Sequence, residues 1–377
     1  MMWRRFDAWV ERGGYTSRDV SIFRIVYASV AVVFFPSYSW IARFDDSFFQ
    51  PAPGPMRLFV GFPPAPFFYL LDGVVGIALL CVLLGLFTVP ASVVLSLALL
   101  VGEGFAFSFG KIDHSILFVL TPLFLSAAGW GDHFSVDAMR RRGVNAPSRM
   151  TSGMLRAFAV FVGVCFVTGA LPKIRGGWLD PSTQATFAFV IQRVERGRSD
   201  WLIGPLSSLH VPIAWEALDW ATVSLEFGLL FLVIQWRAWR VGLSFAALFH
   251  LGVLVSLDID FWMNVLAYGA FVQWTSMPWG PLRRIERWFA AHPPVSMGLA
   301  GLAVVGLAIR AHGGTPLTES LGWVVVVAGA AVAIGYLLSL LVGWRRGRGA
   351  KAGRNALAMR KAGLSVQEVG ERAWTQR

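Results

Sequence analysis

Apolar runs long enough to cross a membrane recur along the whole of this chain. A transmembrane helix needs about 20 predominantly apolar residues, because each residue adds about 1.5 Å and the hydrocarbon core is about 30 Å thick. Only 15% of the 377 residues are charged, whereas soluble proteins carry about 25%. We therefore predict an all-α fold, a polytopic transmembrane helical bundle of about ten spans. The ten segments lie near 20–37, 67–87, 91–108, 114–129, 153–171, 213–235, 241–257, 261–276, 296–310 and 321–343.

Basic residues form short clusters between these segments, and the clusters set the predicted orientation. They precede the first segment and follow the fourth, sixth, eighth and tenth, so with ten spans they share one side. Since loops rich in Lys and Arg stay in the cytoplasm, we predict a multi-pass protein of the cell membrane with both termini cytoplasmic. The long segment 172–212 then lies outside, and its stretch "TFAFVIQRVERG" predicts an amphipathic or re-entrant interfacial helix. The basic clusters lack interleaved aromatic residues, so we expect no nucleic-acid partner despite the net charge of +11.

The composition changes towards the end of the chain. The last two segments are rich in Gly, Ala and Val and contain no acidic residue. We therefore divide the chain into a transmembrane domain at 1–290, an additional transmembrane helix pair at 291–344 and a basic cytoplasmic tail at 345–377. The tail is either a basic helix on the anionic inner leaflet or a solvated segment. Membrane lipid is the expected partner in the first case.

Several polar side chains fall inside or next to apolar segments, where a charge costs roughly 2.5–3.5 kcal/mol on insertion scales. With the orientation above, Arg24 and Glu226 fall in the inner half, and Arg24 is expected to reach the cytoplasmic headgroups. The others converge on the outer half, which predicts a polar cavity open to the outer face. They are Asp72, Glu103, Lys111, Asp113, His114, Lys173, His250, Asp258, Asp260 and Asn264.

Each of these residues also has a purely structural interpretation. Lys173 is a snorkelling anchor at a helix end on this view, and His250 is a packing residue that bridges two membrane helices. Asp258 and Asp260 are solvated turn residues. Asp72 and Glu103 are harder to explain in this way, because burying an unpaired acid is costly.

Other common chemistries find no support in the sequence. The six histidines include no pair at i, i+3 or i, i+4, so we expect no metal site on a helix. Phosphate-binding glycine loops and nucleophile elbows are absent. The two cysteines lie inside apolar segments, so we predict buried thiols and no disulfide framework.

Three stretches, taken in order, resemble the horizontally transferred transmembrane (HTTM) family, which includes the vitamin K-dependent gamma-glutamyl carboxylase. They are "DHSILFVLTPLFLSAAGWGDHFSVD", "TGALPKIRGGWLD" and "FHLGVLVSLDIDFWMNVLAYGAF", and the likeness covers roughly residues 15–290. The resemblance implies a lyase-type activity at the outer membrane face. A reduced vitamin K or menaquinone would react with O2, and the strong base so obtained would remove a proton from a peptide or protein substrate, to which CO2 adds.

The resemblance also implies roles for particular residues. Lys173 would take a proton from the hydroquinone and His114 would contact the ring, so both are the predicted catalytic residues. A lysine that acts as a base must be neutral, which burial at a hydrocarbon boundary favours, and Pro172 could turn Lys173 towards a cavity. The predicted cofactor-binding residues are His250, Trp178, Asp113, Asp72 and Glu103, with Asp72 or Glu103 as candidates to hold the lysine.

Three functions remain open at this level. The first is a quinone-dependent enzyme whose substrate is unknown, since Pro172 replaces the first of two adjacent lysines and two spans replace a large lumenal domain of the carboxylase. The second is a non-catalytic membrane protein that binds a lipid or assists the maturation or export of a peptide. The third is a transporter, which the scarcity of polar residues in the inner half argues against.

Overall fold

The computed structural model describes residues 13–110, 115–141, 151–198, 202–277 and 317–361, together with 298, 301–302 and 306, and the side chains of the last long stretch over 322–344. This part of the chain is helical and contains no strand, which confirms the predicted all-α class. Its helices are α2 (Ser17–Val33), α3 (Ala65–Leu84), α4 (Thr88–Ala106), α5 (Ser115–Ser126), α6 (Val136–Arg140), α7 (Thr151–Arg175), α8 (Ala185–Glu195), α9 (Ile203–Ser207), α10 (Pro212–Leu232), α11 (Trp236–Leu257), α12 (Trp262–Tyr268) and α15 (Leu317–Lys361).

Short 3-10 turns complete the described chain. They lie between α2 and α3 at Ser39–Arg43, Asp46–Phe48 and Pro55–Leu58, after α4 at Phe107–Phe109, and after α12 at Gly269–Phe271 and Trp274–Ser276.

Five stretches of described helix are long and apolar enough to cross a membrane. They are Ala65–Leu84, Thr88–Phe109, Thr151–Arg175, Trp236–Leu257 and Gly322–Trp344. These stretches match five of the predicted segments, and they support a membrane protein. The predicted segment at 296–310 lies mostly outside the described residues.

Two predicted spans are too short as helices to cross a bilayer alone. The α5 helix has 12 residues and α12 has seven, which correspond to rises of about 18 Å and about 10 Å against a core of about 30 Å. Most of α5 and the stretch Asn264–Tyr268 of α12 are buried inside the bundle. Their apolar sequences reflect packing against other helices, so the count of ten spans is not confirmed.

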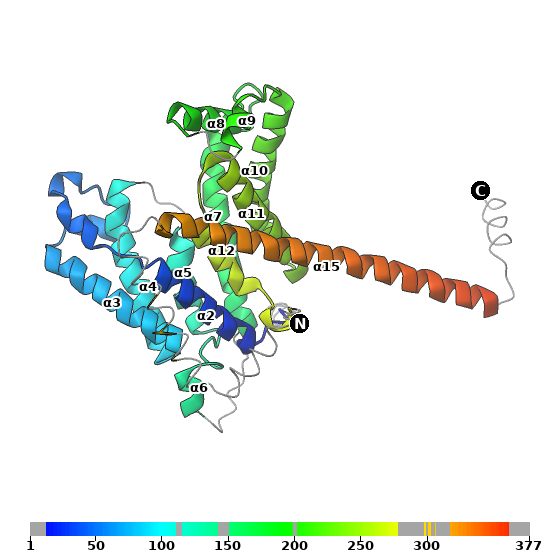
Figure 1. Ribbon diagram of the computed structural model, residues 1–377, viewed down its shortest axis with the longest axis horizontal. Coiled ribbons are helices and arrows are strands. Elements are labelled where there is room, and N and C mark those ends of the chain that lie inside the picture. The colour runs from blue at the N-terminus through cyan, green and yellow to red at the C-terminus, as the bar shows by residue number, and fades with distance from the viewer. Residues whose placement is uncertain are drawn as a thin grey trace, which may run out of the picture.

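The helices form two packed groups that meet at α5 and α12. Figure 1 shows α2, α3, α4 and α5 on one side and α7, α10 and α11 on the other. Close contacts join α3 to α4, α4 to α5, α7 to α10, and α12 to α5. Tyr27 of α2 lies at the centre of the first group, where its hydroxyl donates to the Phe118 carbonyl at 2.9 Å and its ring stacks on Phe118 at 5.1 Å.

The α7 and α10 helices pack with their backbones close together. A Cβ added at Gly163 would lie 2.8 Å from the Leu230 Cα atom, so only glycine permits this approach. Near one end of the pair, Arg156 of α7 donates to the Val233 carbonyl, and its guanidinium lies 3.9 Å from the centre of the Trp236 ring. These contacts set which residues of α7 and α10 face each other.

The stretch "TFAFVIQRVERG" forms a helix, α8, as predicted, and its place in the membrane interface stays a prediction. Its buried residue Val190 packs with Ile203 of α9 and Trp215 of α10 in a small separate core. This core holds α8 and α9 over one end of α10, as Figure 1 shows.

Arg24 does not reach the headgroups, so that prediction was wrong. Its side chain is fully buried, and its guanidinium donates to the carbonyls of Val82 at 2.6 Å and Leu83 at 2.9 Å, in the last turn of α3. It also donates to the carbonyls of Trp130 at 3.0 Å and Phe134 in the segment after α5. A helix end leaves its final carbonyls without intrahelical donors, and the negative end of the helix dipole attracts a cation. The charge is therefore satisfied inside the protein.

The last described helix, α15, packs on α11 and α12 through small residues. A Cβ at Gly329 would lie 2.2 Å from Val265 Cγ1 of α12, and Ala330 and Ala333 are also buried. Arg240 Nε of α11 donates to the Tyr336 hydroxyl at 3.4 Å. The predicted domain boundary near 290 falls outside the described residues, and the helix continues past the predicted start of the tail as far as Lys361.

Replacing Gly329 with leucine is expected to loosen α15 from the bundle. The added side chain would overlap Val265, and overpacking of this kind typically costs about 1–3 kcal/mol. The matched control is Gly335→Leu, since nothing lies within 4 Å of a Cβ added there. Thermal melting of the purified protein in detergent should show a lower midpoint for Gly329→Leu alone. Equal midpoints for the two variants would show that α15 does not dock through Gly329.

Candidate functional site

Lys173 lies in the last turn of α7, but its ammonium group points back into the bundle. Its Nζ forms an ion pair with Glu226 Oε1 of α10, and the two side chains are 24% and 4% exposed. Helical side chains lean towards the N-terminus of their helix, which takes Nζ about one turn away from the helix end. Trp178 covers the same group, with its ring centre 5.0 Å from Nζ. Two of the predicted site residues, Lys173 and Trp178, thus lie next to each other.

The partner of Lys173 differs from the prediction. Sequence reasoning proposed Asp72 or Glu103 to hold the lysine, and it assigned Glu226 to the opposite half of the membrane. The structure pairs Lys173 with Glu226 because the close α7–α10 contact sets the alignment and the lysine reaches inwards. The helix also continues through Pro172 to Arg175 without a break.

Asp72 acts as a cap for the loop that follows α2. Its carboxylate accepts hydrogen bonds from Ser37 Oγ at 2.7 Å, Tyr38 N at 2.7 Å and Ser39 N at 3.1 Å. These donors precede or begin the first 3-10 turn, whose amide hydrogens have no partner of their own. These contacts give Asp72 a structural role, which is enough to explain why an acidic residue lies in the apolar helix α3.

His250 is buried in α11 and hydrogen bonds to a tyrosine. Its Nε2 lies 2.9 Å from the Tyr268 hydroxyl, and the two residues are 2% and 5% exposed. The rings of Phe261 and Phe166 lie 4.8 Å and 6.2 Å from the imidazole, respectively. Tyr268 also lies near enough to Glu226 to interact with it electrostatically. The two buried pairs, Lys173–Glu226 and His250–Tyr268, are thus neighbours inside the bundle.

The other predicted residues of this group cannot be placed. His114, Asp113 and Lys111 lie outside the described residues. Their predicted roles therefore remain predictions.

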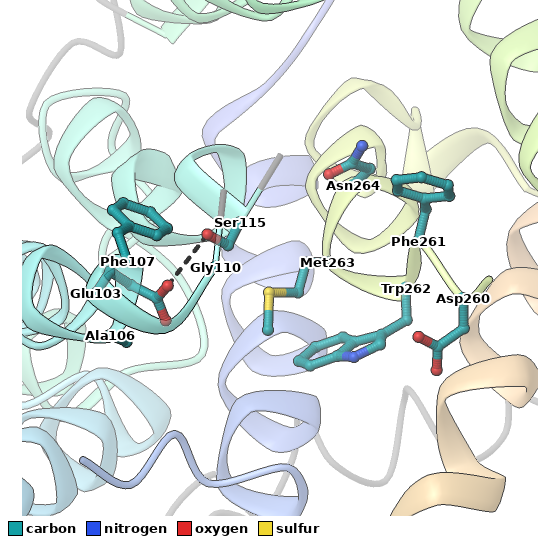
Figure 2. Close-up of a pocket in the computed structure, with 10 residues that line it drawn as sticks. All are labelled: Glu103, Ala106, Phe107, Gly110, Ser115, Asp260, Phe261, Trp262, Met263 and Asn264. Atoms are coloured by element: carbon teal, nitrogen blue, oxygen red, sulfur yellow. Dashed lines mark hydrogen bonds between the residues drawn. The ribbon is translucent and has the colours of Figure 1, made fainter. Parts of the chain in front are cut away.

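A cavity of about 300 Å³ lies between the end of α4, the start of α5 and the turn that leads into α12. Figure 2 shows Glu103 and Phe107 on one side, and Asp260, Phe261 and Trp262 on the other. The described residues that line it are Glu103, Ala106, Phe107, Gly110, Ser115, Asp260, Phe261, Trp262, Met263 and Asn264. Three of these ten residues are aromatic, and a carboxyl group lies on each side.

Of the described residues that were predicted to bind a cofactor, Glu103 lines this cavity. It accepts hydrogen bonds from the Tyr38 hydroxyl at 3.1 Å and from Ser115 Oγ at 3.2 Å. The serine is the first residue of α5, so Glu103 joins α4 to α5 at the cavity wall. This contact is drawn in Figure 2.

Two further polar residues of the wall come from the turn between α11 and α12. Asn264 is 1% exposed, and its side chain interacts with the Tyr268 hydroxyl. Asp260 keeps access to solvent, as predicted, but its carboxyl group also lies against α15, where a Cβ at Gly322 would be 2.0 Å from Oδ2. This partial burial, together with the charge of Asp258, raises the pKa of Asp260 above its usual range.

The cavity and the buried pairs share a wall. Phe261 lines the cavity and faces His250, and Asn264 lines the cavity next to Tyr268. Lys173 and Glu226 are not among the described residues that line the cavity. The sequence analysis missed Tyr268 and the role of Glu226. No pattern in the neighbouring residues predicts that Tyr268 contacts His250 or that Glu226 contacts Lys173.

The structure offers no metal site within the residues it describes. No group of three or more His, Cys, Asp or Glu side chains there could hold a metal ion. Cys81 and Cys165 are both free and partly buried.

Comparison with known proteins adds no relative. No protein-family model, curated protein or solved structure matches this chain. The resemblance to the HTTM family therefore remains a prediction based on the stretches quoted above.

Proposed function

We propose that this chain is a multi-pass protein of the cell membrane that uses a reduced quinone and O2 at the outer face, with Lys173 as the proton acceptor. About ten spans and cytoplasmic termini belong to the same proposal. The observation that carries it is the inward-facing Lys173–Glu226 pair next to the buried His250–Tyr268 pair. A simple anchor would direct its ammonium group towards the headgroups.

The ion pair gives Lys173 a route to the neutral form that a base requires. Burial penalises both charges, and Glu226 is 4% exposed. Transfer of one proton from Nζ to Oε1 leaves a neutral amine and a neutral carboxylic acid at the same place. The amine can then accept a phenolic proton, while the acid keeps the first proton inside the bundle. His250 and Tyr268 lie against the wall of the cavity through Phe261, and Glu226 acts electrostatically on Tyr268.

The cavity suits the ring of a quinone. Its volume of about 300 Å³ is at the lower end of ligand pockets and leaves room for one flat bicyclic ring. Phe107, Phe261 and Trp262 offer faces for stacking. A bound reduced vitamin K or menaquinone would supply the chemistry, which is the epoxidation of its ring by O2. The resemblance links this epoxidation to the removal of a proton from a peptide or protein substrate and the addition of CO2.

A second function is favoured by the same ion pair. An ammonium group that a carboxylate already holds is a poor base, and Asp72 is fully occupied as a cap. These contacts support a non-catalytic membrane protein that binds a lipid or assists the maturation or export of a peptide. The two functions differ in whether Lys173 loses its proton during a reaction.

The deciding experiment is turnover of a reduced naphthoquinone by the purified protein in detergent, with epoxide measured by chromatography. Lys173→Arg is the critical variant, because arginine keeps the ion pair with Glu226 but cannot act as a base. We expect epoxide from the wild type and a loss of about 10²- to 10⁴-fold in Lys173→Arg, the usual range for a general base. Arg175→Ala, which removes a neighbouring exposed charge, should retain full turnover.

The opposite results are equally informative. Undiminished turnover in Lys173→Arg would exclude Lys173 as the base. No epoxide from folded wild-type protein, with quinone binding demonstrated, would favour the non-catalytic function.

A further inference from the structure

Two arginine side chains lie close together at the end of the bundle opposite Lys173. Arg156 is in the second turn of α7 and Arg240 is in the second turn of α11, whereas Lys173 lies in the last turn of α7. The guanidinium of Arg156 lies 3.9 Å from the centre of the Trp236 ring, and that of Arg240 lies 5.8 Å from the centre of the Tyr15 ring. The two rings are in contact, with 5.0 Å between their centres. Two cations therefore flank one pair of aromatic rings.

The described contacts of the two arginines are with neutral groups. Arg240 Nε donates to the Tyr336 hydroxyl at 3.4 Å, and its guanidinium also interacts with the Tyr15 hydroxyl. None of the ion pairs between described residues includes Arg240. Arg156 donates to the Val233 carbonyl. Two positive charges in one partly buried place repel each other, so the site attracts an anion.

Two N–H groups of this site have no acceptor among the described residues. The indole of Trp236 is 6% exposed, and its Nε1, the single donor of that side chain, makes no hydrogen bond there. The same is true of Arg240 Nη1, which is also buried. Guanidinium and indole groups only donate, so they cannot satisfy each other. Because a buried donor without an acceptor costs about 1–3 kcal/mol, an acceptor from outside the described residues is expected here.

The position of the site in the fold indicates which anion is available. Trp236 is the first residue of α11, and the N-cap residue Gln235 gives this helix no side-chain cap, so its first amides are left for an anion. Arg156 and Arg240 lie about 6–8 Å inside the ends of their helices, at 1.5 Å per residue. Since α7 and α11 are long enough to cross a membrane, this depth is close to the level where lipid headgroups begin.

We propose that Arg240 and Trp236, flanked by Arg156 and Tyr15, bind the phosphate group of an anionic phospholipid. The phosphate oxygens accept from Nη1 and Nε1 and compensate the two positive charges. Arg240 keeps partial access to solvent, so the site is open on one side. Under the predicted orientation the lipid belongs to the inner leaflet. The site is separate from Lys173 and does not depend on quinone chemistry.

The test measures lipid retention by native mass spectrometry of the full-length protein released from detergent. The probes are phosphatidylglycerol, which is anionic, and phosphatidylcholine, which has no net charge. We expect the wild type to retain phosphatidylglycerol in preference, and Arg240→Met to weaken this retention about tenfold, or 1.4 kcal/mol. The matched control is Arg237→Met, which removes an exposed positive charge three residues earlier on the same helix and should retain the lipid as the wild type does.

A second variant tests the indole donor without removing a charge. Trp236→Phe keeps an aromatic ring for Arg156 but lacks the N–H group, so we expect a loss of about threefold, the effect of one neutral hydrogen bond. This variant also covers the case that Arg240→Met does not fold. Melting midpoints without added lipid check the folding of all three variants.

Each outcome has a definite meaning. Equal retention of phosphatidylglycerol by the wild type, Arg240→Met and Trp236→Phe would overturn the inference and leave the stacked side chains a structural role alone. Equal retention of the two lipids by the wild type would exclude a site for an anionic lipid. Protection from thermal unfolding by inorganic phosphate, lost in Arg240→Met, would support the phosphate site with a soluble ion as its occupant. Absence of quinone turnover would leave all these results unchanged.

Discussion

Replacing Arg24 with methionine is expected to prevent the protein from accumulating in folded form. Four carbonyl oxygens, from the end of α3 and the segment after α5, would lose their hydrogen bond to the guanidinium, and only that of Val82 keeps a described donor, the Gly85 amide. Each unsatisfied buried acceptor costs about 1–3 kcal/mol, and the total approaches the whole stability of about 5–15 kcal/mol of a typical domain. Size-exclusion chromatography of a fluorescent fusion in detergent measures the folded yield directly.

Two further variants define the cause of this effect. Arg24→Lys should not rescue the yield, because an ammonium group lacks the five-donor fork that reaches all four carbonyls. Arg18→Met, six residues earlier on the exposed side of α2, should leave the yield near the wild-type level. A normal yield of Arg24→Met would show that the guanidinium does not hold α3 and the following segment together.

The second large effect is expected at the Lys173–Glu226 pair. Lys173→Met leaves Glu226, 4% exposed, without its partner, and breaking a buried pair in this way typically costs about 3–5 kcal/mol. Glu226→Leu should cost less, because Lys173 is 24% exposed and its long side chain can turn towards water. The double variant Lys173→Met/Glu226→Leu should regain most of the loss, since it removes both charges together.

Thermal melting of the four proteins in detergent forms a double-mutant cycle. The expected result is a marked fall for Lys173→Met, a smaller fall for Glu226→Leu and a partial recovery in the double variant. Strictly additive losses would contradict the pairing. This cycle measures stability alone, so it is independent of whether Lys173 is a base.

The helices themselves could largely be predicted from the sequence, and the exceptions have one cause. The segments that became α3, α4, α7 and α11 are long and apolar, and their positions agree with the prediction to within a few residues. The segments that became α5 and α12 have the same apolar character, but they are short and buried in the bundle. An apolar run therefore predicts a segment that is shielded from water. It does not tell whether the segment contacts lipid or is buried among other helices.

The candidate site was predictable only in part. Lys173, His250 and Glu103 stood out because polar groups in apolar segments are costly, whereas Trp178 was named through the resemblance. Tyr268 was missed since a tyrosine in an apolar run is ordinary. Asn264 was grouped with the polar residues of the predicted outer cavity but was given no role, because the sequence does not tell which side chains a cavity buries.

What the sequence by itself determined is local: where helices form, how apolar they are and which polar groups need a partner. The choice of partner was decided by the tertiary structure. Lys173 meets Glu226 across 53 residues, and Arg24 meets carbonyl groups 58 to 110 residues away. The physical reason is that helix formation depends on neighbours three and four residues apart, whereas a buried charge is satisfied by whatever helix packing brings within about 3 Å.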